Sequence, residues 1–122
     1  MILFPKYTYL ISNRSTSDPN GTIGPLTYHY APNNMDRPYK SSWFSVVPSN
    51  SLMTSLTQDL ATRYQGSAGP VDIMFYIHGY ATSGEYAKIG LVGLGLGLTS
   101  VGIDRGILVG VSWPSNTWTY GE

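Results

Sequence analysis

Two apolar runs in this chain of 122 residues end in side chains that could take part in acyl-transfer chemistry. The run 71–77 leads into His78, and the run 106–112 ends in Ser112, with Ser115 close behind it. A serine hydroxyl becomes a strong nucleophile when a histidine within hydrogen-bond reach takes its proton. These residue types therefore raise the question of a serine-based active site.

Chain order argues against Ser112 as that nucleophile. A nucleophilic serine of the G-x-S-x-G type lies on a strand-to-helix turn, and an acid and then a histidine follow it. Gly110 lies two residues before Ser112, but Pro114 takes the place of the second glycine, and neither histidine nor aspartate follows. We interpret Ser112 as the end of a strand, before a turn made by Trp113 and Pro114.

Other candidate sites in the sequence are weaker. A triad of Asp72, His78 and Ser83 would need the first two side by side, but they lie at opposite ends of one strand, roughly 20 Å apart at about 3.3 Å per residue. His29 lies between two tyrosines on an alternating strand, where a partly exposed surface position is expected. The glycine run 93–97 lacks the third glycine of G-x-G-x-x-G and lies inside a helix pattern. We expect no cofactor.

The composition excludes several classes of partner. Charged residues make up 11 % of the chain and seven basic residues balance seven acidic ones, so no attraction to nucleic acid is expected. Two histidines and no cysteine offer few metal ligands. The uncharged and largely apolar stretch 89–103 has fifteen residues, whereas a membrane span needs about 20. With no signal-peptide pattern at the start, we expect one cytoplasmic domain over 1–122, without metal, nucleic acid or membrane as a partner.

The first half of the chain predicts a strand pair and a helix. Alternating aromatic and β-branched residues at 6–12 and 26–30 predict two antiparallel strands on either side of the turn-forming segment 13–24. A short third strand is expected at 42–47. From 51 to 64 the apolar residues recur with the period of a helix. Its apolar face comprises Leu52, Met53, Leu56, Leu60 and Tyr64, and its other positions include Gln58, Asp59 and Arg63.

The second half predicts a strand, a helix and a strand. The run 71–77 is the kind of strand that lies in a parallel sheet covered on both faces. Thr82 and Glu85 form the T-x-x-E pattern of a capping box, so a helix is expected from about Thr82 to Ser100, followed by a strand at 106–112. Three glycines on one helical face could allow close approach to the sheet: Gly90, Gly93 and Gly97. The fold class is therefore α/β, with an N-terminal antiparallel strand pair leading into a parallel βαβ sheet, in three layers.

Three motifs follow one another along the chain. They are Tyr9-Leu-Ile-Ser-Asn-Arg14 with Gly24-Pro-Leu-Thr-Tyr28, then Asp72-Ile-Met-Phe-Tyr-Ile-His-Gly-Tyr80, then Val111-Ser-Trp-Pro-Ser115. Together they resemble the N-terminal portion of the α/β-hydrolase family, in particular its poorly characterised esterase-like branch. The resemblance implies a partial α/β-hydrolase fold and the hydrolysis of an ester or related acyl bond.

The resemblance also implies a division of roles around the first of the two apolar runs. In that family the loop after the third strand donates a backbone N–H to the oxyanion, and the matching positions here are Tyr80 and Ala81. His78 and Gly79 would shape this loop. The family's serine, acid and histidine would all lie beyond Glu122. The resemblance therefore implies an incomplete domain, inactive alone, that acts on a small ester or acyl substrate as part of a longer protein.

A second hypothesis comes from the edge of the sheet. If the family's strand order holds, the strand 71–77 has an open edge in this chain, and an apolar edge strand invites pairing with another chain. The chain would then be a non-enzymatic interaction module that completes its sheet by self-association or with a partner strand. A small flavodoxin-like binding domain is a third reading.

Overall fold

The computed structural model describes residues 7–15, 17, 22–32, 41–63, 72–79, 82–101 and 106–114. In these residues the chain forms a mixed five-stranded sheet with two α-helices, an α/β architecture as predicted. The strands are β1 (Tyr7–Arg14), β2 (Ile23–Pro32), β3 (Ser45–Val47), β4 (Asp72–Ile77) and β5 (Gly106–Ser112). The helices are α1 (Ser49–Arg63) and α2 (Gly84–Ser100), with a short 3-10 helix at Ser41–Trp43.

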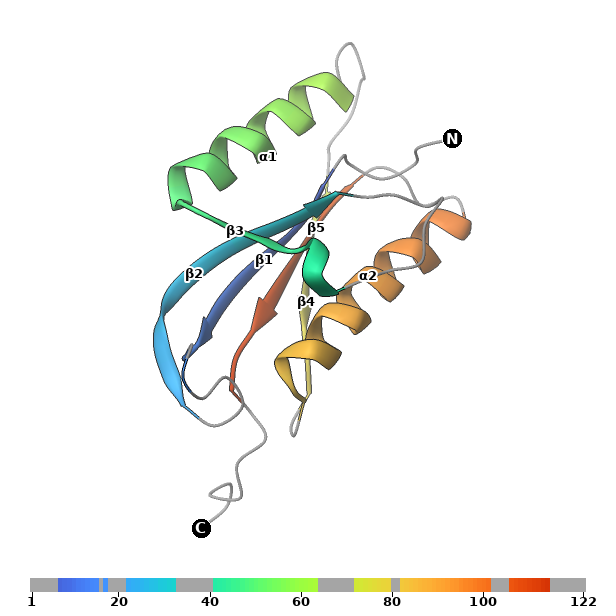
Figure 1. Cartoon of the computed structure of the whole chain (residues 1–122). Coiled ribbons are helices and arrows are strands. Elements are labelled where there is room, and N and C mark those ends of the chain that lie inside the picture. The colour runs from blue at the N-terminus through green and yellow to red at the C-terminus, as the bar shows by residue number, and fades with distance from the viewer. Residues whose placement is uncertain are drawn as a thin grey trace.

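The sheet has the order β3-β2-β1-β5-β4 and combines two kinds of pairing. The predicted antiparallel pair is present, with β1 beside β2, and β4 and β5 form the predicted parallel pair around α2. The strand β1 lies parallel to β5 in a register that places Ser12 opposite Ser112. Because β1, β5 and β4 run the same way, their carboxyl ends meet at one edge of the sheet (Figure 1).

Helices cover both faces of the central strands, which gives the three predicted layers (Figure 1). On one face Leu10 and Leu108 pack against Leu91 of α2. On the other face a second cluster packs against α1, and its buried members are Tyr9, Leu52, Ile107 and Val109. Alternate residues of β1 and β5 thus enter opposite cores, as the period of a strand requires.

The prediction that the strand 71–77 is covered on both faces is wrong. Ile73, Phe75 and Ile77 of β4 are 51 %, 62 % and 64 % exposed, whereas Met74 and Tyr76 pack against the core on the α2 side. The reason is the position of α1, which packs against β1 and β2 rather than over β4. Among the described strands β4 pairs only with β5, so its other edge is open, as the chain order led us to expect.

The predicted face of the first helix is partly wrong. Leu52, Leu56 and Leu60 pack against the sheet, but Met53 is 57 % exposed and Asp59 is buried. The Tyr9 hydroxyl, buried in the same core, donates a hydrogen bond of 3.1 Å to Asp59 Oδ2. A buried hydroxyl needs a partner, and this contact turns Asp59 inward. The predicted Tyr64 lies outside the described residues.

The start of α2 also differs from the prediction. The helix begins at Gly84, and its cap is Ser83 rather than Thr82, because the Tyr86 N–H donates to Ser83 Oγ at 3.1 Å. The close approach predicted for the glycines is present at Gly90, where a Cβ would lie 2.5 Å from Tyr76 Oη. At Gly93 and Gly97 the prediction is wrong, because a Cβ at either would meet only open space.

Candidate functional site

A buried arginine joins the ends of the three parallel strands. Arg14, the last residue of β1, is only 7 % exposed. Its Nε–H donates to Ser112 Oγ at 2.7 Å, and its Nη2 donates to the Thr82 carbonyl at 2.8 Å. The same Nη2 lies 3.1 Å from His78 Nε2. One guanidinium therefore connects β1, the end of β5 and both sides of the loop that links β4 to α2.

An irregularity in β1 brings Arg14 to this position. The register with β2 shifts between Ser12 and Arg14, as in a β-bulge, and the Arg14 N–H donates to Ser12 Oγ at 3.2 Å. A bulge redirects the side chain that follows it. Here it turns Arg14 toward the parallel strands. Burial lowers the pKa of the guanidinium from its ordinary value by desolvation, yet arginine remains charged in proteins.

The ring of His78 lies among backbone groups and is only 4 % exposed. The Trp113 N–H donates to its Nε2 at 2.9 Å, and its Nδ1 lies 2.9 Å from the Gly79 carbonyl. Since Nε2 accepts from both Trp113 and Arg14, the ring proton must be on Nδ1, which then donates to Gly79. The ring also stacks on Trp113, with centroids 5.2 Å apart and an interplanar angle of 14°. His78 thus holds the loop after β4 against the segment after β5.

These contacts leave Ser112 and His78 poorly suited to nucleophilic catalysis. Ser112 is 3 % exposed, and its Oγ accepts from a guanidinium, which cannot act as a base. The lone pair of His78 Nε2, which a general base would use, already faces two N–H donors. The cluster is built to position backbone, and its fixed positive charge can stabilise a nearby anion.

Some of the site residues predicted from the sequence lie in this cluster, and others lie outside the described residues or elsewhere in the fold. His78 and Ser112 belong to this cluster, and Gly79 follows His78 with an exposed backbone. Tyr80 and Ala81, the predicted oxyanion donors, lie outside the described residues, as does Ser115. Asp72 begins β4 at the opposite end from His78, so no triad forms with it.

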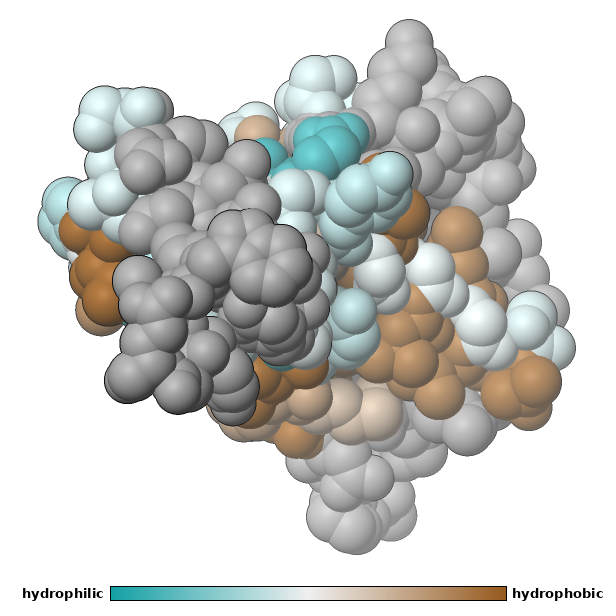
Figure 2. Space-filling model, turned by 90° about the horizontal axis from the view of Figure 1, so that it is seen from below, coloured by the Kyte–Doolittle hydropathy of each residue, from teal (hydrophilic) through white to brown (hydrophobic). Residues whose placement is uncertain are grey.

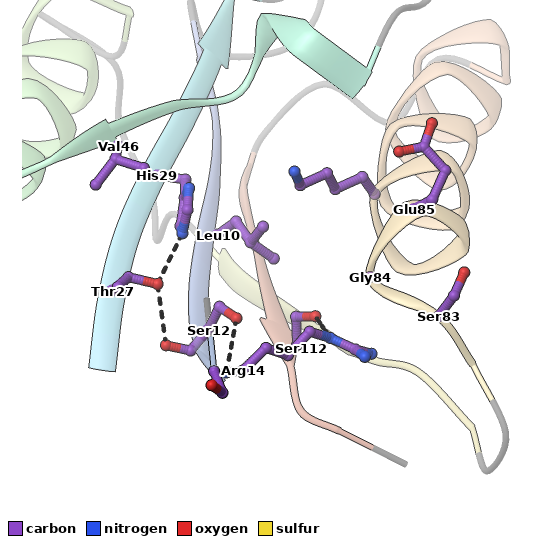
Figure 3. Close-up of a pocket in the computed structure, with 12 residues that line it drawn as sticks. Leu10, Ser12, Arg14, Thr27, His29, Val46, Ser83, Gly84, Glu85 and Ser112 are labelled. Atoms are coloured by element: carbon purple, nitrogen blue, oxygen red, sulfur yellow. Dashed lines mark hydrogen bonds between the residues drawn. The ribbon is translucent and has the colours of Figure 1, made fainter. Parts of the chain in front are cut away.

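A cleft opens beside the cluster, between the sheet and the first turns of α2 (Figure 3). Its volume is about 470 Å³, and Leu10, His29, Val46 and Lys88 are among its lining residues. His29 Nε2 lies 2.8 Å from Thr27 Oγ1, which in turn donates to the Ser12 carbonyl at 3.3 Å. Desolvation, and then the positive charge of Lys88, lower the pKa of His29. His29 is partly exposed, as expected, and the surface that it contributes to is the lining of this cleft.

Sequence reasoning missed the role of Arg14, although the residue lies in one of the quoted motifs. The signal that could have found it is an arginine at the end of an apolar strand, since a buried guanidinium requires several acceptors. Within the described ranges, no group of three or more histidine, aspartate or glutamate side chains is placed to bind a metal ion.

Comparison of the chain with protein-family models, with curated proteins and with solved structures finds no significant match. None of the helices in the described part of the chain is long and apolar enough to cross a membrane.

Proposed function

We propose that this chain is the N-terminal segment of a serine hydrolase of the α/β-hydrolase type, which cleaves ester or related acyl bonds. In this proposal the segment supplies the oxyanion loop, through the backbone of Tyr80 and Ala81, to a nucleophile carried further along a longer chain. The observation that carries the proposal is the double contact of Arg14 Nη2. It contacts His78 before these two residues and the Thr82 carbonyl after them.

The electrostatic setting supports the same role. The helix α2 begins at Gly84, directly after the loop, and a helix N-terminus carries a partial positive charge. The positive charge of Arg14, whose Nη2 donates to the Thr82 carbonyl, adds to it. A backbone N–H held in such a field stabilises a developing oxyanion, and a single donor of this kind contributes about 3 kcal/mol to catalysis in enzymes where it has been removed.

The proposal assigns no turnover to residues 1–122 alone. Ser112 Oγ accepts from Arg14 and His78 Nε2 accepts from the Trp113 N–H, and these hydrogen bonds differ from those of a nucleophile and its general base. The serine, acid and histidine are expected downstream, with the serine in a G-x-S-x-G turn.

Two observations test this proposal directly. The coding sequence beyond Glu122 should contain a G-x-S-x-G segment after an apolar strand, followed by an acid and a histidine. Residues 1–122 should not hydrolyse p-nitrophenyl acetate above the rate of a heat-denatured sample. A reading frame that stops at Glu122, or turnover that is lost on heating, would contradict the proposal.

A second candidate function, sheet completion by self-association, is favoured by the open edge of β4. The residues Ile73-Met-Phe-Tyr-Ile77 carry no charge, and an isoleucine lies two positions to either side of Phe75. In an antiparallel pair of two copies centred on Phe75, each Ile73 would face Ile77 of the other copy. The exposed side chains of this strand would then pack beside their own equivalents across the new strand pair.

Sedimentation velocity at several concentrations tests this candidate. A defined dimer is expected, and Phe75→Lys should weaken it by at least a hundredfold, because two lysines of like charge would face each other at the centre of the strand pair. Met53→Lys is the matched control, since Met53 is also exposed but lies on α1. A monomer at every concentration, or equal effects of the two substitutions, would contradict self-association through β4.

A further inference from the structure

We propose that the cleft between the sheet and α2 binds a small organic carboxylate, with its charged group at Lys88 and His29 and its apolar part against Leu10 and Val46. This inference does not depend on the proposed hydrolase function, because it uses neither the loop after β4 nor a nucleophile. It concerns a ligand site of the described residues themselves.

The shape of the cleft suits a ligand of this size. Its volume of about 470 Å³ lies within the range of roughly 300 to 1,000 Å³ that is usual for small-molecule sites. Figure 3 shows it bounded by β1 and β2 on one side and by the start of α2 on the other. Leu10 and Val46 give it apolar walls, whereas polar side chains come from both sides. An apolar pocket with a few polar groups selects an amphipathic molecule.

The charges of the lining favour an anion. Arg14 and Lys88 are cationic and Glu85 is the one acidic side chain among the described lining residues. Lys88 and Glu85 share the first turns of α2 but form no ion pair with each other, and the Lys88 Nζ lies 5.7 Å from the centroid of the Phe44 ring. The ammonium is therefore held over an aromatic ring, beside the cleft, and none of the described carboxylates forms an ion pair with it. A ligand carboxylate would supply that missing charge.

His29, on the opposite wall of the cleft, lies in the same positive electrostatic field. The charged groups that line the cleft around it are Arg14 from β1 and Glu85 and Lys88 from α2, while β2 and β3 contribute Thr27 and Val46. Desolvation and the charge of Lys88 lower the pKa of His29. A bound carboxylate would offset the charge of Lys88 and favour protonated His29. Binding should therefore take up protons at a pH between the pKa of His29 in the free chain and its pKa in the bound chain.

A titration of residues 1–122 with hexanoate, followed by NMR of the backbone amides, tests the site. Saturable shifts are expected at Leu10, His29, Val46 and Lys88. Hexanamide has the same shape without the charge, and it should bind at least tenfold more weakly, as should hexanoate to Lys88→Gln, since each change removes one charge-assisted contact. Arg63→Gln on α1, on the other face of the sheet, is the matched control and should bind as the unchanged chain does.

Calorimetry in two buffers with different ionisation enthalpies adds a readout specific to His29. Proton uptake is expected with the unchanged chain and should disappear in His29→Gln. The proposal is overturned if the shifts do not saturate, if hexanamide binds as well as hexanoate, or if Lys88→Gln behaves as Arg63→Gln does. Binding without proton uptake would remove His29 from the site as proposed.

Discussion

The carboxyl ends of the parallel strands and the outer strand β4 differ in which kind of side chain is exposed to water. At the strand ends, polar side chains are buried and hydrogen-bonded to one another, with Arg14, His78 and Ser112 each less than a tenth exposed. Along β4, apolar side chains are more than half exposed on one face, and the far edge of the strand is unpaired among the described strands. The polar side chains of the cluster have hydrogen-bond partners within the chain, whereas the apolar face of β4 is exposed to water.

This difference shows that the polar cluster is a complete local structure, whereas the exposed face of β4 is not. The cluster draws its donors and acceptors from β1, β5 and the two flanks of one loop, so its geometry is set within the chain. The exposed face of β4 has no comparable closure, and further apolar residues are exposed on α2, including Ile89. Figure 2 shows hydrophobic residues exposed over the lower and right-hand part of one view of the molecule, with a separate group at the left. Apolar surface of this kind marks an interaction site or a core that continues elsewhere.

Removing Arg14 should give the largest effect on the polar side of this comparison. Arg14→Leu leaves Ser112 Oγ, His78 Nε2 and the Thr82 carbonyl without a shared donor, and we expect the free energy of unfolding to fall by roughly 3 kcal/mol. Urea denaturation measures it. Arg63→Leu, at the end of α1, is the control and should change stability by less than about 0.5 kcal/mol. Equal losses in the two variants would show that the cluster does not hold the strand ends together.

Two glycines allow a tightly packed position to be compared with one that has open space around it. A Cβ at Gly110 of β5 would lie 2.5 Å from Leu91 Cδ2 and 3.0 Å from Leu10 Cδ1, so Gly110→Ala should destabilise the fold by about 2 kcal/mol through overpacking. A Cβ at Gly93 on α2 would meet only open space. Gly93→Ala should therefore stabilise by up to about 1 kcal/mol through helix propensity. Thermal melts of both variants check the opposite signs, and effects of the same sign would contradict the packing described for α2.

The smallest expected effect is the pH dependence that His29 adds to stability. The pKa of His29 is lowered in the folded chain, so the unfolded chain binds more protons below the unfolded value of about 6.5. The contribution of His29 is therefore fully present above that pH and is lost as the pH falls toward the folded pKa. The urea midpoint of unfolding should fall less between neutral and mildly acidic pH in His29→Gln than in the unchanged chain. An identical pH dependence in the two would show that the cleft does not perturb His29.

Much of the fold follows from short-range patterns in the sequence. The alternation around Tyr9 and Tyr28 predicted the antiparallel pair, and the run 106–112 predicted β5 with the observed bounds. The helical period of the apolar residues at 51–64 predicted α1. Each of these depends on residues a few positions apart, where the period of the backbone decides which side chains share a face.

The remainder depends on residues far apart in the chain. Asp59 is buried because Tyr9, fifty positions away, needs a hydrogen-bond partner, and the face of β4 is bare because α1 packs over other strands. The cluster at the strand ends requires Arg14, His78 and Ser112 to meet, which no local pattern encodes. Sequence reasoning therefore brought forward His78 and Ser112 as separate signals but could not supply the arginine that joins them.

Covalent labelling with a serine-directed fluorophosphonate, read by intact mass and peptide mapping, tests the central proposal most directly. Residues 1–122 should gain no adduct, because Ser112 is buried against Arg14 and the described residues place no base beside Ser83. The product of the complete reading frame should gain one adduct, on a serine downstream of Glu122. An adduct on Ser83, Ser112 or Ser115, or a complete product without any adduct, would contradict the proposal.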